Sequence, residues 1–137
     1  MVFQVYTVAG QRRHKFQRQT VLNGTDALIF VWDSLIDQWD ENIWSLKELL
    51  RFYGDKLIAQ SPGDPPDVPM VVMANKRDLD DIVEVDKVRQ VLDTANLDDV
   101  LVYETIAIEG TNVKRAFVYV ARQAVLNHYN QLSGKSK

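Results

Sequence analysis

The sequence predicts an α/β fold in which an open, mostly parallel sheet is covered by helices on both faces. Short, fully apolar runs are typical of strands buried on both faces, and they alternate here with segments whose apolar residues recur at helical spacing. Such alternation indicates parallel strands joined by helical crossovers. With 137 residues, 46% of them hydrophobic, the chain is large enough for one domain with its own core.

Four segments are predicted to be strands, separated by turns or by helices. The first alternates and is rich in β-branched and aromatic residues, and the others are short apolar runs. In chain order they are Val2–Val8, Asp26–Trp32, Val71–Ala74 and Val100–Tyr103. In parallel sheets of this kind, ligands bind outside the carboxyl ends of the strands, so the loops after Val8, Ala74 and Tyr103 are of most interest.

Three helices are predicted from their apolar spacing. The first begins near Asp40 and stops at Gly54, the second covers about 85–95, and the third is a long amphipathic helix capped by Thr111 or Asn112. Residues 57–69 hold all four prolines and are expected to form an irregular surface loop inside the single domain, which spans 1–137. The segment 12–23 is polar and basic with a weak helical pattern.

Composition excludes several classes of protein. A net charge of -3 argues against a nucleic-acid binder, and the absence of cysteine excludes disulfides and thiolate metal sites. The apolar runs are too short for a membrane span, so a cytoplasmic domain is expected. His14 and His128 are isolated, and we assign them neither a metal nor a catalytic role. Three tryptophans are expected in the core or at its border: Trp32, Trp39 and Trp44.

The loop after the third strand, Asn75–Asp78, carries the strongest chemical signal. Guanine presents two adjacent donors, its ring N–H and its amino group, and the Asp78 carboxylate can accept both. Adenine would leave that carboxylate unpaired. Asn75 can bridge neighbouring loops and reach the ring edge, while the stem of Lys76 can cover the ring face. The alternative is an ordinary turn into a helix with a solvated Lys76-Arg77 pair.

Two further loops give weaker signals. After the last strand, the small side chain of Ala107 would let a backbone N–H approach the guanine carbonyl oxygen. After the first strand, Gly10 would permit close backbone approach to a phosphate, and Gln11 could orient an attacking water. A tight turn followed by a solvated glutamine explains this second segment equally well.

Together these three loops resemble those of the Ras superfamily of small GTPases. Residues 6–11 resemble the DxxGQ segment, with Thr7 in place of the aspartate, a departure shared with MglA-type GTPases, which are close to the Arf and Rag branches. Residues 75–78 match the NKxD motif, and residues 105–108 match the S-A-K segment only at Ala107. The resemblance implies a P-loop NTPase-like fold, GTP or GDP as ligand, and Mg²⁺ in the complete family site.

The family's first strand, phosphate loop, switch I and second strand have no counterpart in this sequence. The single Gly-Lys-Ser, at 134–136, follows a helix and does not form a phosphate loop. In the family the missing first strand would lie between the first two predicted strands here. We therefore expect these strands to pair directly, or a second chain to fill the gap by strand exchange in a homodimer, unless Met1 is an artificial start.

Two functions remain open at this point. One is a guanine-nucleotide-binding switch that hydrolyses GTP only when a phosphate loop is supplied. The other is a pseudo-GTPase interaction module with weak or no nucleotide binding. The basic residues Arg12, Arg13, Lys15 and Arg18 form either a solvated face or a partner surface in switch II. By resemblance, an effector or activating protein would bind at switch II, and a roadblock-domain protein is the natural candidate.

Overall fold

The computed structural model describes residues 4–5 and 24–133. Three strands and three α-helices alternate along the second of these ranges, with short 3-10 turns at 36–38, 54–57 and 107–109. In chain order the elements are β1 (Leu28–Asp33), α2 (Trp39–Tyr53), β2 (Met70–Asn75), α3 (Val85–Thr94), β3 (Leu101–Glu104) and α4 (Val113–Leu132). All six elements were predicted from the sequence, and the bounds of the strands and the starts of the helices differ from the prediction by at most two residues.

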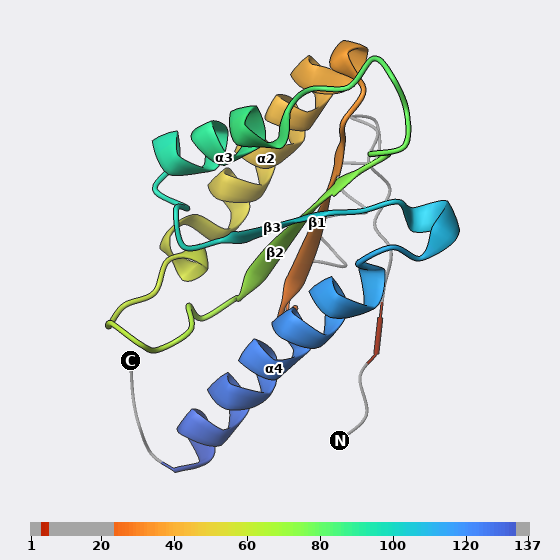
Figure 1. The fold of residues 1–137 in the computed structure, drawn as a ribbon. Coiled ribbons are helices and arrows are strands. Elements are labelled where there is room, and N and C mark those ends of the chain that lie inside the picture. Colours follow the sequence, from red (N-terminus) through yellow and green to blue (C-terminus); the bar gives the residue numbers. More distant parts are fainter. Residues whose placement is uncertain (1–3, 6–23, 134–137) are drawn as a thin grey trace.

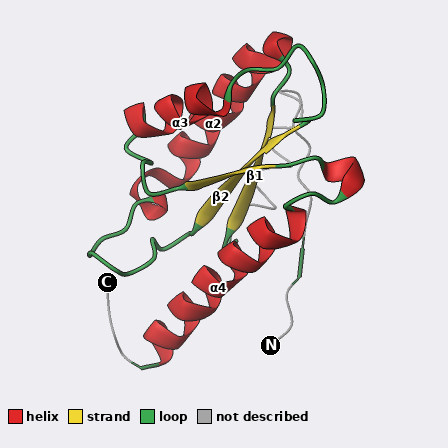
Figure 2. Ribbon diagram, in the orientation of Figure 1, coloured by secondary structure: helices red, strands yellow, loops and turns green. Residues whose placement is uncertain are grey.

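The three strands, yellow in Figure 2, form one parallel sheet in the order β1-β2-β3. The register pairs Leu28 with Met70 and Asp33 with Asn75, and it pairs Ala74 with Glu104 across the second interface. The prediction of a parallel α/β sheet is confirmed. Because all strands run the same way, their carboxyl ends meet at one edge, where the loops of interest lie.

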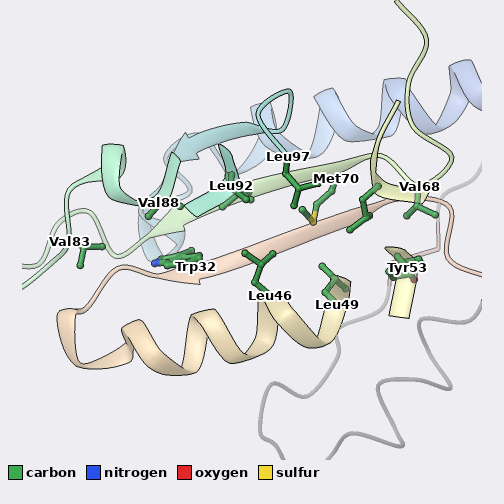
Figure 3. Close-up of a cluster of buried hydrophobic side chains, with 12 residues drawn as sticks. Trp32, Leu46, Leu49, Tyr53, Val68, Met70, Val83, Val88, Leu92 and Leu97 are labelled. Carbon is green, nitrogen blue, oxygen red and sulfur yellow. The ribbon is translucent and has the colours of Figure 1, made fainter. Parts of the chain in front are cut away.

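Helices cover both faces of this sheet (Figure 1). Helices α2 and α3 lie side by side on one face, and the larger hydrophobic cluster fills the space beneath them, as Figure 3 shows for Trp32, Leu46 and Leu92. Helix α4 lies on the opposite face, where Ala116 and Val120 pack against Val71 of β2. Alternate residues of a strand point to opposite faces, which is why β2 is buried on both and β1 divides its side chains between the two clusters.

The expectation that β1 is buried on both faces was wrong. Only Trp32 of this strand is buried, whereas Val31 is 54% exposed. Among the described residues β1 pairs with β2 alone, so it forms an edge of the sheet and has less cover than the central strand. The first predicted strand, which would share this edge with β1, lies outside the described residues apart from Gln4 and Val5. The expected direct pairing of the two stays a prediction.

The proline-rich segment 57–69 is irregular, but it is not wholly a surface loop. Its middle is exposed, whereas Leu57 and Val68 at its two ends are buried in the larger cluster. The side chain of Asn127 on α4 donates hydrogen bonds to the carbonyls of Pro66 and Asp67, at 2.7 and 3.3 Å, and is itself buried. The segment is therefore anchored to both faces of the fold.

The helix ends agree with prediction in position and differ in one chemical detail. Gly54 stops α2 with a φ of 55°, a left-handed value that glycine adopts without penalty. Asn112 does precede α4, but its side chain caps no helical N–H. Instead the backbone of Asn112 has a left-handed conformation, with a φ of 59°. Its Nδ2 donates a hydrogen bond to the Glu104 carbonyl at 2.8 Å. The expected cap thus ties the helix to the end of β3.

Among the described helices, none combines the length and apolar character that crossing a membrane requires. Of the three tryptophans expected in the core, Trp32 is buried and packs edge-on against Trp39, with ring centroids 5.4 Å apart. Trp39 and Trp44 are partly buried. The prediction for these residues is confirmed.

Candidate guanine-nucleotide site

The candidate site is built from the loops that follow the carboxyl ends of the three strands. Asp33, Asn75 and Glu104 are the last residues of β1, β2 and β3. Their loops are joined by backbone hydrogen bonds: the Ser34 N–H donates to the Asn75 carbonyl at 3.3 Å, and the Arg77 N–H donates to the Thr105 carbonyl at 3.2 Å. The parallel register therefore assembles one surface from segments far apart in the sequence.

Asn75 is fixed at the centre of this surface. Its Oδ1 accepts two hydrogen bonds, from the Ala107 backbone N–H at 2.9 Å and from the Thr105 hydroxyl at 3.1 Å. Thr105 is fully buried, so its hydroxyl is a rigid donor. Within the described residues the Nδ2 of Asn75 has no acceptor. The two bonds set the orientation of the amide and leave its donor end available, as the predicted role at the ring edge requires.

Lys76 follows with an unusual backbone and a defined partner. Its φ of 66° lies in the left-handed region, which a residue with a long side chain adopts only when its surroundings impose it. Its ammonium forms an ion pair with Asp33 Oδ2 at 2.9 Å, and the two side chains are 41% and 30% exposed. The carboxylate at the end of β1 thus holds the lysine at the end of β2.

Arg77 clamps the same loop from its other side. Its Nη1 donates to the Val83 carbonyl at 2.7 Å, and its Nε pairs with Glu104 Oε1 at 3.3 Å. The side chain of Arg77 is 18% exposed. The Arg77 side chain is therefore mostly buried, whereas Lys76 is partly exposed, and both cations have partners that tie the loop to neighbouring strands.

Asp78 and Ala107 complete the part of the predicted site that the structure describes. Asp78 is exposed, one residue beyond the clamped Arg77, and within the described residues its carboxylate has no ion-pair partner. Ala107 lies in the turn Ala107–Glu109 and is joined to the Asn75 side chain by its own N–H. Four predicted residues, Asn75, Lys76, Asp78 and Ala107, thus lie in two loops that hydrogen bonds connect.

The other predicted residues cannot be placed. Gly10 and Gln11 lie outside the described residues, as do Thr7 and the basic run of 12–18. In the part of the chain that the structure describes, no group of three or more His, Asp or Glu side chains gathers in a way that could hold a metal ion.

Sequence reasoning missed Thr105, Asp33 and Asn42. Thr105 is the buried hydroxyl that orients Asn75, and a threonine directly after a strand that ends beside the motif was the available signal. Asn42 is buried on α2 and brackets the end of β1: its Nδ2 donates to the Asp33 carbonyl at 2.7 Å, and its Oδ1 accepts the Asp33 N–H at 3.2 Å. The contact between Asn42 and Asp33 joins a helix to a strand, and no repeating pattern of residues in the sequence indicates it.

The parallel α/β sheet and this arrangement of loops are typical of Ras-like small GTPases. Comparison with known proteins supports the same class. The model of the ADP-ribosylation factor (Arf) family matches residues 1–124. The chain therefore belongs to the Arf family of Ras-like small GTPases. The Arl6 BBS3 small GTPase from Trypanosoma brucei, solved with the bound nucleotide analogue GppNp, has a similar fold, with a TM-score of 0.65 and 22% identity over 83% of this chain and 67% of that one.

Known small GTPases are also similar to this chain in sequence. The mutual gliding-motility protein MglA of Myxococcus xanthus is 34% identical over 120 residues, which are 88% of this chain and 57% of the relative. The Ras-related protein Rab7 of Drosophila melanogaster is 33% identical over 126 residues, 91% of this chain and 57% of the relative. The chain thus spans a little over half the length of these relatives.

Proposed function

We propose that this chain binds the base of a guanine nucleotide and serves as part of a GTP-dependent molecular switch. The observation that carries the proposal is the fixed amide of Asn75, held by donors from Thr105 and Ala107 with its own donor end left available. Family membership supports the same class of ligand.

Base recognition would follow from three adjacent groups. The Asp78 carboxylate would accept the ring N–H and the amino group of guanine, a charge-assisted pair that adenine cannot offer. Asn75 would donate from Nδ2 to an acceptor on the ring edge, and the stem of Lys76 would cover the ring face. Because the Ala107 N–H already donates to Asn75, its expected contact with the guanine carbonyl would be the second branch of a three-centre hydrogen bond.

Hydrolysis would require groups beyond the described residues. Gln11 would orient the attacking water and Gly10 would approach a phosphate, in the roles that such residues have in GTPases. The phosphate loop and the Mg²⁺ that GTPases use would have to come from a segment that has no counterpart in this sequence. The proposal includes a protein partner at switch II, either a roadblock-domain regulator or another effector. It also includes a cytoplasmic location.

The second candidate is a pseudo-GTPase interaction module, which keeps the family's surfaces with weak or no nucleotide binding. Within these 137 residues the groups available for binding a nucleotide are the base contacts described above. Base contacts alone would leave affinity in roughly the micromolar-to-millimolar range, given the free-energy cost of association.

Guanosine and adenosine have no phosphates, so their binding reports recognition of the base alone. Their comparison therefore distinguishes the two candidates. Titration of each into the purified, isotope-labelled protein would be followed by the backbone amide signals of residues 75–78 and 105–108. We expect guanosine to shift these signals in a saturable manner and adenosine to leave them unchanged. Equal shifts with both nucleosides, or none with guanosine, would refute the proposal.

A second measurement tests for nucleotide retained from the cell. The purified protein is denatured, and the supernatant is chromatographed for guanine nucleotides. Stoichiometric GDP would refute the interaction module, whereas its absence together with a guanosine response would indicate base recognition without a grip on the phosphates.

A further inference from the structure

Lys76 is held from outside its own loop, and the residue that holds it is Asp33. The two oxygens of the Asp33 carboxylate divide their contacts. Oδ1 accepts the Leu35 N–H at 3.1 Å and so closes the turn after β1, whereas Oδ2 pairs with the Lys76 ammonium at 2.9 Å. One oxygen therefore serves the local backbone, and the other acts on a residue 43 positions away.

Asp33 is itself fixed by the fold. Its N–H and carbonyl are both bonded to the buried side chain of Asn42, and the strand register places it beside Asn75. The carboxylate thus projects from a backbone that α2 and β2 hold in place. A charge presented in this way has a defined position relative to the end of β2, although the ion pair itself is partly exposed.

We propose that Asp33 is a positioning residue of the guanine-nucleotide site, acting through Lys76. The inference rests on the proposed function. A lysine side chain loses rotamer freedom when it must lie over a ring, and a side chain already restrained by an ion pair loses less on binding. The pair thus orders the stem of Lys76 in advance of the base, next to the amide of Asn75.

The substitution Asp33→Asn separates the two roles of the carboxylate. Asparagine keeps an Oδ1 that can accept the Leu35 N–H, and it leaves the backbone contacts with Asn42 intact. It removes the charge that attracts Lys76. Because a partly exposed ion pair contributes little to folding, the urea midpoint is expected to change only slightly. We expect the dissociation constant for GDP to rise about three- to tenfold, the range that corresponds to one side chain that must be ordered on binding.

A double-mutant cycle shows whether Asp33 acts through Lys76. Binding of GDP would be measured by calorimetry for the unmodified protein, Asp33→Asn, Lys76→Gln and the double variant. The effect of Asp33→Asn should disappear in the Lys76→Gln background, whereas a merely structural role would weaken binding in both backgrounds. Asp33→Glu, which restores the charge, should recover part of the affinity. Asp37→Asn, an exposed acid in the next turn, is the matched control and should bind GDP normally.

Three results would overturn the inference. Unchanged or tighter binding by Asp33→Asn would mean that the pair does not prepare Lys76 for the base. Equal losses in both backgrounds would assign Asp33 a structural role. No binding of GDP by the unmodified protein would refute the proposed function and this inference with it, and is thus distinguishable from the first two results.

Discussion

Single hydrogen-bonding groups decide how the candidate site is organised. The Oδ1 of Asn75 accepts hydrogen bonds from Thr105 and Ala107. The carboxylate of Asp33 forms an ion pair with the ammonium of Lys76. Asp78 differs from these residues because its carboxylate has no ion-pair partner within the described part of the chain. A site for an external ligand needs both kinds of residue: groups that the fold fixes, and at least one group left for the ligand.

The first prediction at this scale concerns the choice of base. Asparagine in Asp78→Asn presents one acceptor and one donor, which match the ring N–H and the adjacent carbonyl of xanthine. We expect GDP to bind roughly 10- to 100-fold more weakly, as loss of a charge-assisted pair implies, while xanthosine diphosphate gains affinity. Competition binding checks this, with the neighbouring exposed Asp80→Asn as control. Parallel loss of both nucleotides would contradict the assigned role of Asp78.

The second prediction concerns the buried hydroxyl of Thr105. Thr105→Val keeps the shape and removes the donor to Asn75 Oδ1, so the amide loses one of the two bonds that orient it. We expect a stability loss of about 1 kcal/mol in urea unfolding and several-fold weaker guanosine binding. The same change in Thr94→Val, at an exposed position of α3, should leave guanosine binding unchanged. Undiminished binding by Thr105→Val would show that Ala107 alone suffices to orient Asn75.

At the scale of elements, side-chain amides join helices to strands and loops, whereas no side chain caps the N-terminus of α2, α3 or α4. Asn112 does not cap α4 but bonds to the end of β3. Asn42 on α2 brackets the end of β1, and Asn127 on α4 donates to the proline-rich segment. In each case an amide satisfies backbone groups that no strand or helix ladder would reach.

Loss of one such link should release the segment it anchors. Asn127→Ala removes the two hydrogen bonds to the carbonyls of Pro66 and Asp67, and we expect a loss of about 1–3 kcal/mol in the free energy of unfolding. Limited proteolysis should then cut within 58–69 faster than in the unmodified protein. Gln131→Ala, one turn further along α4 and exposed, is the control. Equal cleavage rates in the two variants would mean that the segment is held by Leu57 and Val68 without help from α4.

At the scale of the whole molecule, the sheet is protected unevenly. The central strand β2 is buried on both faces, whereas β1 has one neighbouring strand among the described residues and carries the exposed Val31. Strand β2 contributes Met70 and Val72 to the larger hydrophobic cluster and Val71 and Met73 to the smaller one, so this strand links the two clusters. Changes in β2 should therefore affect the stability of the whole fold.

Two valines test this uneven protection by the same chemical change. Val72→Ala in β2 removes two methyl groups from a fully buried position, and we expect a loss of about 2 kcal/mol. Val31→Ala in β1 should cost less than about 0.5 kcal/mol, because that side chain is largely exposed. Urea unfolding of both variants checks the contrast. A large loss in Val31→Ala would indicate that a further segment covers this strand in solution, as the expected pairing with the first strand or strand exchange would require.

The sequence by itself determined the alternation of strands and helices, the parallel sheet, and the residue types of the NKxD loop. These features depend on local periodicity and spacing, which a single chain displays directly. It did not reveal that Thr105 orients Asn75 or that Asp33 and Asn42 support Lys76, because those contacts join residues 9 to 43 positions apart. Only the tertiary structure decided them, since the parallel register brings the strand ends together and selects which side chains meet.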